Sequence, residues 1–186
     1  TPIAITKKIA TLEEIRFHPV SVRGRFDKAH EFLLDNMVYL SDAGYHVITP
    51  LHVEATDLYV LVNRGWIPLG LDRSVLPQID TPDEIVEIRG IADSFSKRAF
   101  TLGDSEPIKD AWPKRWANMD AERFSKAAGY SLLPFVILQD KDSPHGFERH
   151  WDFKFFKSKA IINLGYAIQW FAFAVVMLVI FVVVST

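Results

Sequence analysis

The feature that most constrains this chain is a long uncharged run at its C-terminal end. No charged side chain follows Lys159, and the 25 residues from Ala160 to Val184 are predominantly apolar. About 20 helical residues span the ~30 Å hydrocarbon core of a bilayer. A soluble helix that is apolar on every side would need more packing partners than a domain of this size supplies. The run therefore predicts a transmembrane helix over residues 160–184.

The residues before this run are typical of a membrane interface. Aromatic side chains and lysines alternate from Trp151 to Lys159, and both types are accommodated among lipid headgroups. We therefore expect residues 1–155 to form a soluble domain held at a membrane, with lipid as one partner. The lysines on the domain side, taken by themselves, favour a cytoplasmic domain.

Polar and aromatic side chains recur at three- and four-residue spacing in the first turns of the predicted helix. They are Asn163, Tyr166, Gln169 and Trp170. This spacing places them on one helix face, and polar groups near lipid usually turn toward the interface or toward a protein. The face is interpreted as an interfacial anchor, as a docking face for another transmembrane helix, or as a ligand site.

Composition excludes several classes of function. The 186 residues carry a net charge of −2, which gives no broad electrostatic basis for binding nucleic acid. The sequence contains no cysteine, so disulfides, thiolate metal sites and cysteine nucleophiles are excluded. The chain begins at Thr1 without a methionine, and we expect that residues precede it.

The soluble part shows mainly strand patterns. Residues 20–26 and 84–91 alternate apolar and polar side chains, as half-buried strands do. Four more strands are predicted: 31–39 as the hairpin partner of 20–26, 44–50 ending at Pro50, 57–62 ending at Asn63-Arg64-Gly65, and 132–138. Residues 69–82 are predicted to be a loop and residues 93–113 a long excursion.

One helix is predicted within this part, over residues 121–128. Asp120 is a suitable N-cap, and Gly129 suits the left-handed position after a helix. Short strands with one late helix favour a mainly β (α+β) fold, in which an antiparallel sheet curls toward a barrel. A C-terminal transmembrane helix completes the expected architecture.

No motif for catalysis or metal binding is present in the sequence. His46 and His52 flank a predicted strand end, where a metal pair is possible, but scattered histidines are more often ordinary surface residues. The carboxylates Asp72, Asp80, Asp83 and Glu84 lie in a predicted loop region, where solvation explains them better than acid–base chemistry. We therefore expect no catalytic residue, no metal site and no enzymatic activity.

Two short motifs combine tryptophan with cations. The first is Val62-Asn63-Arg64-Gly65-Trp66. Its Arg64 and Trp66 fit a structural corner, in which the arginine stacks on the tryptophan or pins a loop carboxylate. They also fit a protein interface. Trp112-Pro113-Lys114-Arg115-Trp116 fits either a surface that rests on the membrane or a docking patch.

Together these motifs resemble the Surfeit locus protein 1 family of membrane proteins that assist assembly of haem-copper cytochrome oxidases. The resembling segments follow the family's order through nearly the whole chain: residues 16–26, 44–50, 60–68, 88–90, 100–104, 112–113, 132–134, 146–151 and 164–171. The resemblance implies a first transmembrane helix upstream of Thr1. It also implies a bacterial plasma membrane or mitochondrial inner membrane, with the domain on the periplasmic or intermembrane-space side.

The resemblance implies a membrane-anchored assembly factor or accessory subunit that docks to oxidase subunits, with the catalytic subunit as the expected partner. Docking is expected through Arg64 and Trp66 in the domain and through Tyr166, Gln169 and Trp170 in the helix, beside Asn163. The family commonly has a histidine, proposed to ligate haem, where this chain has Asn163, and an amide is a poor axial ligand. No cofactor is therefore expected, and a haem-binding chaperone is the alternative.

Overall fold

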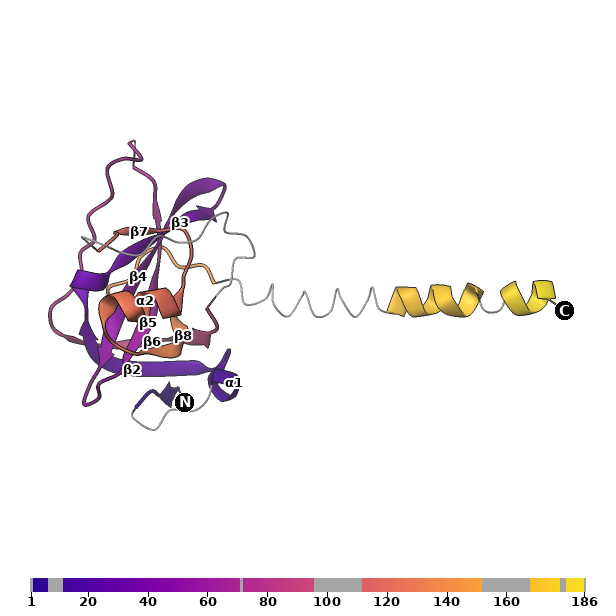
Figure 1. Ribbon diagram of the computed structural model, residues 1–186, viewed down its shortest axis with the longest axis horizontal. Helices are drawn as coiled ribbons and strands as arrows, with labels where there is room; N and C mark the ends of the chain where they lie inside the picture. The colour runs from indigo at the N-terminus through magenta and orange to yellow at the C-terminus, as the bar shows by residue number, and fades with distance from the viewer. Residues whose placement is uncertain are drawn as a thin grey trace. The chain divides into compact units, whose positions relative to one another are not determined.

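The computed structural model describes residues 2–6, 12–70, 72–95, 112–151, 168–177 and 180–185. The chain divides into two compact units, Thr1–His150 and Trp151–Thr186 (Figure 1). The first unit holds the strands, and the second holds a helix over Ile168–Ser185. This helix has 18 residues and is long and apolar enough to cross a membrane.

Five strands of the first unit close into a barrel. They are β2 (Pro19–Phe26), β4 (Asp42–Val53), β5 (Tyr59–Pro68), β6 (Ile85–Asp93) and β8 (Leu132–Gln139). Around the ring β2 pairs with β6, β6 with β8, β8 with β5, β5 with β4, and β4 again with β2. The β5–β8 pairing is parallel and the other four are antiparallel. The predicted mainly β, barrel-like domain is confirmed, although the parallel pairing was not predicted.

Shorter elements extend and cover the barrel. They are β1 (Ile3–Ala4), α1 (Leu12–Ile15), the 3-10 turn η1 (Lys28–His30), β3 (Phe32–Tyr39), β7 (Arg115–Trp116) and α2 (Ala121–Ala128). Strand β3 lies beside β4 outside the ring, and β7 pairs with β3 in parallel. Helix α2 confirms the predicted caps, because the Asp120 carboxylate accepts a hydrogen bond from the amide of Arg123 and Gly129 has a φ of +76°.

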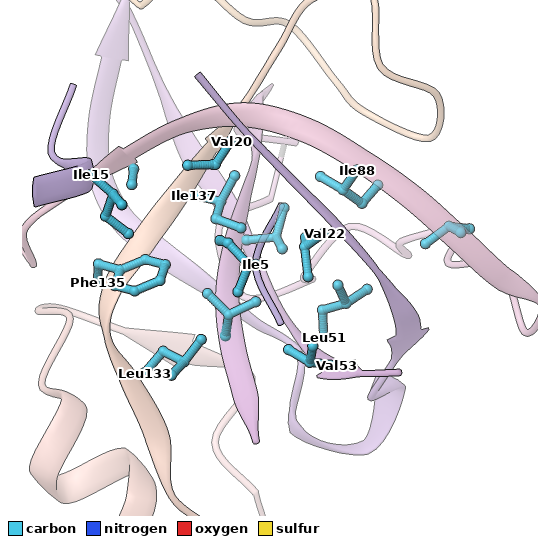
Figure 2. Close-up of a cluster of buried hydrophobic side chains, with 14 of the residues drawn as sticks. Ile5, Ile15, Val20, Val22, Leu51, Val53, Ile88, Leu133, Phe135 and Ile137 are labelled. Atoms are coloured by element: carbon cyan, nitrogen blue, oxygen red, sulfur yellow. The ribbon is translucent and has the colours of Figure 1, made fainter. Parts of the chain in front are cut away.

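The barrel interior is filled by the apolar side chains that the alternating strands direct inward. Val20 and Val22 of β2 are buried beside Ile88 of β6 and Ile137 of β8 (Figure 2). Ser21, which lies between the two valines on β2, is more exposed. This is the two-residue period expected from the sequence. Burial of such a cluster is the main source of the barrel's stability.

A second apolar cluster covers the outside of β4, β5 and β8. Trp116 of β7 lies 5.0 Å from Phe32 of β3 between ring centroids, and Phe124 of α2 lies 5.7 Å from Phe32. Leu61 and Val136 complete this cluster from the barrel side. Trp116 is therefore a core residue, and the prediction that it belongs to a membrane-resting or docking patch is wrong.

The pairing of β3 and the end of β4 differ from prediction. Strand β3 pairs with β4 and β7 rather than with β2, because η1 turns the chain away from β2. Strand β4 continues through Pro50 instead of stopping there. On one edge, β4 pairs with β3 as far as Ile48 and with β2 from Leu51 onward. Pro50 lies between these two stretches. A proline is tolerated at such a change of partner because its missing N–H is not needed.

Candidate functional site

The predicted corner at residues 63–66 is a β-bulge inside β5 and not the end of that strand. On β4, Val47 pairs with Gly65 and Ile48 pairs with Asn63, so Arg64 is an extra residue without a partner on that strand. Gly65 has a φ of +121°, which a residue with a side chain rarely adopts. Bulges re-aim side chains, and this one directs Arg64 into the domain.

Arg64 forms a buried ion pair with Glu31. The Arg64 side chain is 1% exposed, and its Nη1 lies 3.1 Å from Oε2 of the glutamate. Thr49 and Thr81 each donate a hydroxyl hydrogen bond of 2.7 Å to the same carboxylate oxygen. Nη1 of Arg64 also donates to the hydroxyl of Thr81. Both charges are therefore satisfied by hydrogen bonds, as buried charges require.

The same guanidinium joins two segments that lie far apart in the sequence. Nη2 donates a 2.8 Å hydrogen bond to the carbonyl of Asp80, and Nε donates one of 2.8 Å to the carbonyl of His145. The rings of Phe26 and Phe147 lie 5.0 and 4.9 Å from its central carbon. Burial lowers the pKa of Arg64, while the charge of Glu31 acts to raise it, and an arginine stays protonated throughout.

The two domain residues predicted to dock a partner have different surroundings. Arg64 lies inside the domain, so a direct contact between its guanidinium and a partner would require the barrel to open. Its contacts with Glu31 and Asp80 fit the structural interpretation that the sequence left open. Trp66 is half-buried and lines an open cavity of about 400 Å³ at the surface. Docking through this corner stays a prediction, and Trp66 is the residue placed to make it.

Trp66 is held by strand β3 and by the last residues of the domain. Its ring nitrogen donates a 3.2 Å hydrogen bond to the carbonyl of Met37, and Tyr39 lies 5.3 Å from its ring. Its backbone exchanges two hydrogen bonds with Glu148, of 2.7 and 3.1 Å. His150 stacks on Tyr39 at 4.9 Å. These contacts fix the tryptophan in one orientation at the edge of the barrel.

A second polar cluster was not predicted from the sequence. The carboxylate of Asp27 lies 2.6 Å from Nδ1 of His30 and accepts a 2.9 Å hydrogen bond from the hydroxyl of Tyr130. Tyr130 stacks on Tyr59 at 3.7 Å. Burial raises the pKa of the Tyr130 hydroxyl, and the nearby Asp27 charge raises it further, so this hydroxyl stays protonated as a donor. The cluster ties η1 to the segment between α2 and β8.

The ionisation of Asp27 makes the stability of the barrel depend on pH. Burial acts to raise the pKa of this carboxyl, but the hydrogen bonds from His30 and Tyr130 outweigh it and hold the pKa below the usual value. A lowered pKa contributes stability above the unfolded value of about 3.9, and that contribution is lost as the pH falls through the folded value. We expect Asp27→Asn to lower the urea midpoint at pH 6, with a difference from the native chain that shrinks below about pH 4. A constant difference between pH 6 and pH 3 would contradict this role of the charge.

The other titratable candidates have ordinary surroundings. Nδ1 of His46 lies 2.9 Å from the side-chain amide of Asn63, and His52 lies 4.7 Å from the ring of Tyr59. Asp72 bonds its own loop at Ser74. Among the residues that the structure describes, no group of three histidines or carboxylates is arranged to hold a metal ion.

The predicted docking face of the C-terminal helix is described in part. Gln169 and Trp170 lie exposed in its first described turn, and Trp170 lies 6.2 Å from Phe173 between ring centroids. Asn163 and Tyr166 lie outside the described residues. The role of this face stays a prediction.

Comparison with known proteins gives one consistent family. A model of the SURF1 family matches residues 1–175. The chain is 27% identical to Surfeit locus protein 1 of Mus musculus over 69% of its own length and 45% of the mouse protein. It is 26% identical to a SURF1-like protein of Rickettsia prowazekii over 92% of its own length and 69% of that protein. The chain thus spans about half the length of the mouse relative and about two thirds of the bacterial one.

Proposed function

The chain belongs to the SURF1 family, as its motifs predicted, and we propose that it is a membrane-anchored assembly factor or accessory subunit of a haem-copper cytochrome oxidase. It would act by docking to oxidase subunits while their cofactors are inserted. The family match over residues 1–175 carries this proposal, and the apolar helix over Ile168–Ser185 supports the anchor. We further propose that the barrel faces the periplasm or the intermembrane space.

The proposed mechanism is differential binding. A docking factor that binds a partly built subunit more tightly than the finished one shifts that subunit toward the state that accepts its cofactor. Such a factor needs a rigid surface more than it needs reactive groups. The closed barrel supports this, because the bulge at Arg64 locks the loop at Asp80 and the segment at His145 to one another.

A non-enzymatic role is part of the proposal. The strongest arrangement for catalysis in the described residues is the Asp27–His30–Tyr130 cluster, since it joins a carboxylate, an imidazole and a hydroxyl. Both oxygens of Asp27 are engaged within the domain, because the amide of Ala29 and the side chains of His30 and Tyr130 occupy them. These bonds favour a structural role for the cluster.

The alternative function is that of a haem-binding chaperone. All six histidines of the chain lie in the described part, within the first unit. Nδ1 of His30 contacts Asp27 and Nδ1 of His46 contacts Asn63, so both rings have partners within the domain. The position where the family commonly has a histidine proposed to ligate haem is Asn163 in this chain, and an amide is a poor axial ligand, so docking is the preferred proposal. Stoichiometric haem on the isolated chain, with a Soret band lost on replacing one histidine, would reverse that preference.

Helix docking is tested by replacing Trp170 with alanine in the full chain. A tryptophan at the centre of an interface contributes about 2 kcal/mol or more to binding, roughly thirtyfold in affinity. We expect the variant to recover much less oxidase on gentle purification from its own membranes. The matched control is Phe171→Ala, an exposed aromatic residue about 100° further around the helix. Equal recovery with both variants would contradict a docking face at Trp170.

A further inference from the structure

The hairpin between β3 and β4 carries two apolar side chains that are largely exposed. Tyr39 pairs with Asp42, so Leu40 and Ser41 form a two-residue turn. Val38 is 69% exposed and Leu40 is 79% exposed. We call residues 38–41 the hairpin tip. Two large aliphatic side chains at a projecting end mark a contact surface more clearly than a single exposed residue would.

The backbone of the hairpin tip makes the choice of leucine unusual. Leu40 has a φ of +46° and Ser41 a φ of +73°, which is the conformation of a tight hairpin turn. Asparagine, aspartate and glycine are preferred there because a branched apolar side chain is strained in the left-handed region. Leu40 is therefore unfavourable for the turn itself. Strained residues of this kind cluster at functional sites, so Leu40 is a candidate for a contact outside the barrel.

The chain leaves the barrel beside this hairpin tip. His150 is the last residue of the first unit, and its ring stacks on Tyr39, the residue before the turn. Two residues earlier, Glu148 pairs with Trp66 through backbone hydrogen bonds. The first unit therefore ends beside the hairpin tip, and the chain continues from there into the unit that holds the apolar helix.

The residues around the tip suit the boundary between lipid headgroups and acyl chains. Tyr39 and Trp66 lie 5.3 Å apart behind the tip, and their amphipathic rings are the types enriched at membrane interfaces. Asp42 and Glu148 add acidic side chains to the same surface and line the cavity beside Trp66.

We propose that the hairpin tip inserts Val38 and Leu40 into the membrane that holds the C-terminal helix. The occupant of this surface is lipid, and the contact would give the barrel a fixed orientation on the bilayer. Two points of attachment restrict the orientation of a tethered domain far more than one does. The inference rests on the membrane anchor, which belongs to the proposed function.

The full chain can be tested directly because it contains no cysteine. Leu40→Cys gives a unique site for an environment-sensitive fluorophore in chain reconstituted into phosphatidylcholine vesicles. Ile85→Cys is the control, since this apolar residue is also exposed, at 43%. Ile85 pairs with Arg25, and Arg25 pairs with His52 near the end of β4 that is remote from the hairpin tip. His52 is ten residues along β4 from Asp42, which is at most roughly 33 Å of strand at ~3.3 Å per residue.

The result expected is a blue-shifted emission at Leu40 with strong quenching by nitroxides on the lipid acyl chains. The Ile85 label should emit as in water and be quenched several-fold less by the same lipids. If the chain floats with the vesicles while both labels remain equally open to aqueous iodide, the hairpin contact is overturned and the anchor stands. If the chain does not float with the vesicles, the anchor fails and this inference fails with it.

Discussion

Replacing Arg64 with alanine is expected to lower the free energy of unfolding by about 3–5 kcal/mol, as removal of one partner from a buried ion pair does. The change leaves the Glu31 carboxylate buried without its cation. It also leaves the carbonyls of Asp80 and His145 without the donor that joins them. The total free energy of unfolding of a domain of this size is about 5–15 kcal/mol, so the variant should be only marginally stable.

The measurement is denaturant unfolding of the detergent-solubilised chain, followed by tryptophan fluorescence. The control is Arg89→Ala, because Arg89 pairs with Glu87 at the surface and such a pair contributes about 1 kcal/mol or less. Adding Glu31→Gln to Arg64→Ala should recover part of the loss, since it removes the unpaired charge. An Arg64→Ala variant as stable as Arg89→Ala would show that the Arg64–Glu31 pair does not hold the bulge.

The sequence predicted the parts of the fold that depend on neighbouring residues. Strand β6 follows from alternation, and helix α2 follows from a cap at Asp120 and a glycine at Gly129. Both signals depend on residues a few positions apart. Strand pairing depends on residues far apart in the sequence, because β2 pairs with β6 and β4 only when the ring closes. The predicted strand end at Pro50 is wrong for the same reason. Whether a proline ends a strand depends on whether the neighbouring strand needs a hydrogen bond from that position.

The sequence predicted Arg64 and Trp66 as candidate residues, but it did not predict where their side chains lie. The motif around Arg64 indicated a corner, and an arginine beside a tryptophan is ordinarily interpreted as a surface pair. Its burial depends on Glu31, Thr49 and Thr81, which lie 33, 15 and 17 residues away along the chain. Asp27 and Tyr130 are 103 residues apart. No local pattern indicates partners at such separations, so these contacts required the structure.

Replacing Gly24 with alanine is expected to cost about 3 kcal/mol, at the upper end of what overpacking a well-filled site causes. Gly24 lies where β2 pairs with both β4 and β6, opposite Val53 and Val86. A Cβ there would lie 2.0 Å from the backbone oxygen of His52. Backbone cannot rotate away as a side chain can, so β2 and β4 would have to separate at the seam that closes the barrel.

The control for this variant is Gly70→Ala, in the loop after β5. A Cβ at Gly70 would approach no atom closer than 3.8 Å, so this change should alter the unfolding midpoint little. Amide exchange separates local from global effects. Opening of the seam predicts faster exchange at Glu54, whose amide donates to the carbonyl of Arg23 across it, before exchange rises in β5 and β8. Equal midpoints for the two variants would mean that the ring absorbs the added methyl group, and that the close approach at Gly24 is not what closes the barrel.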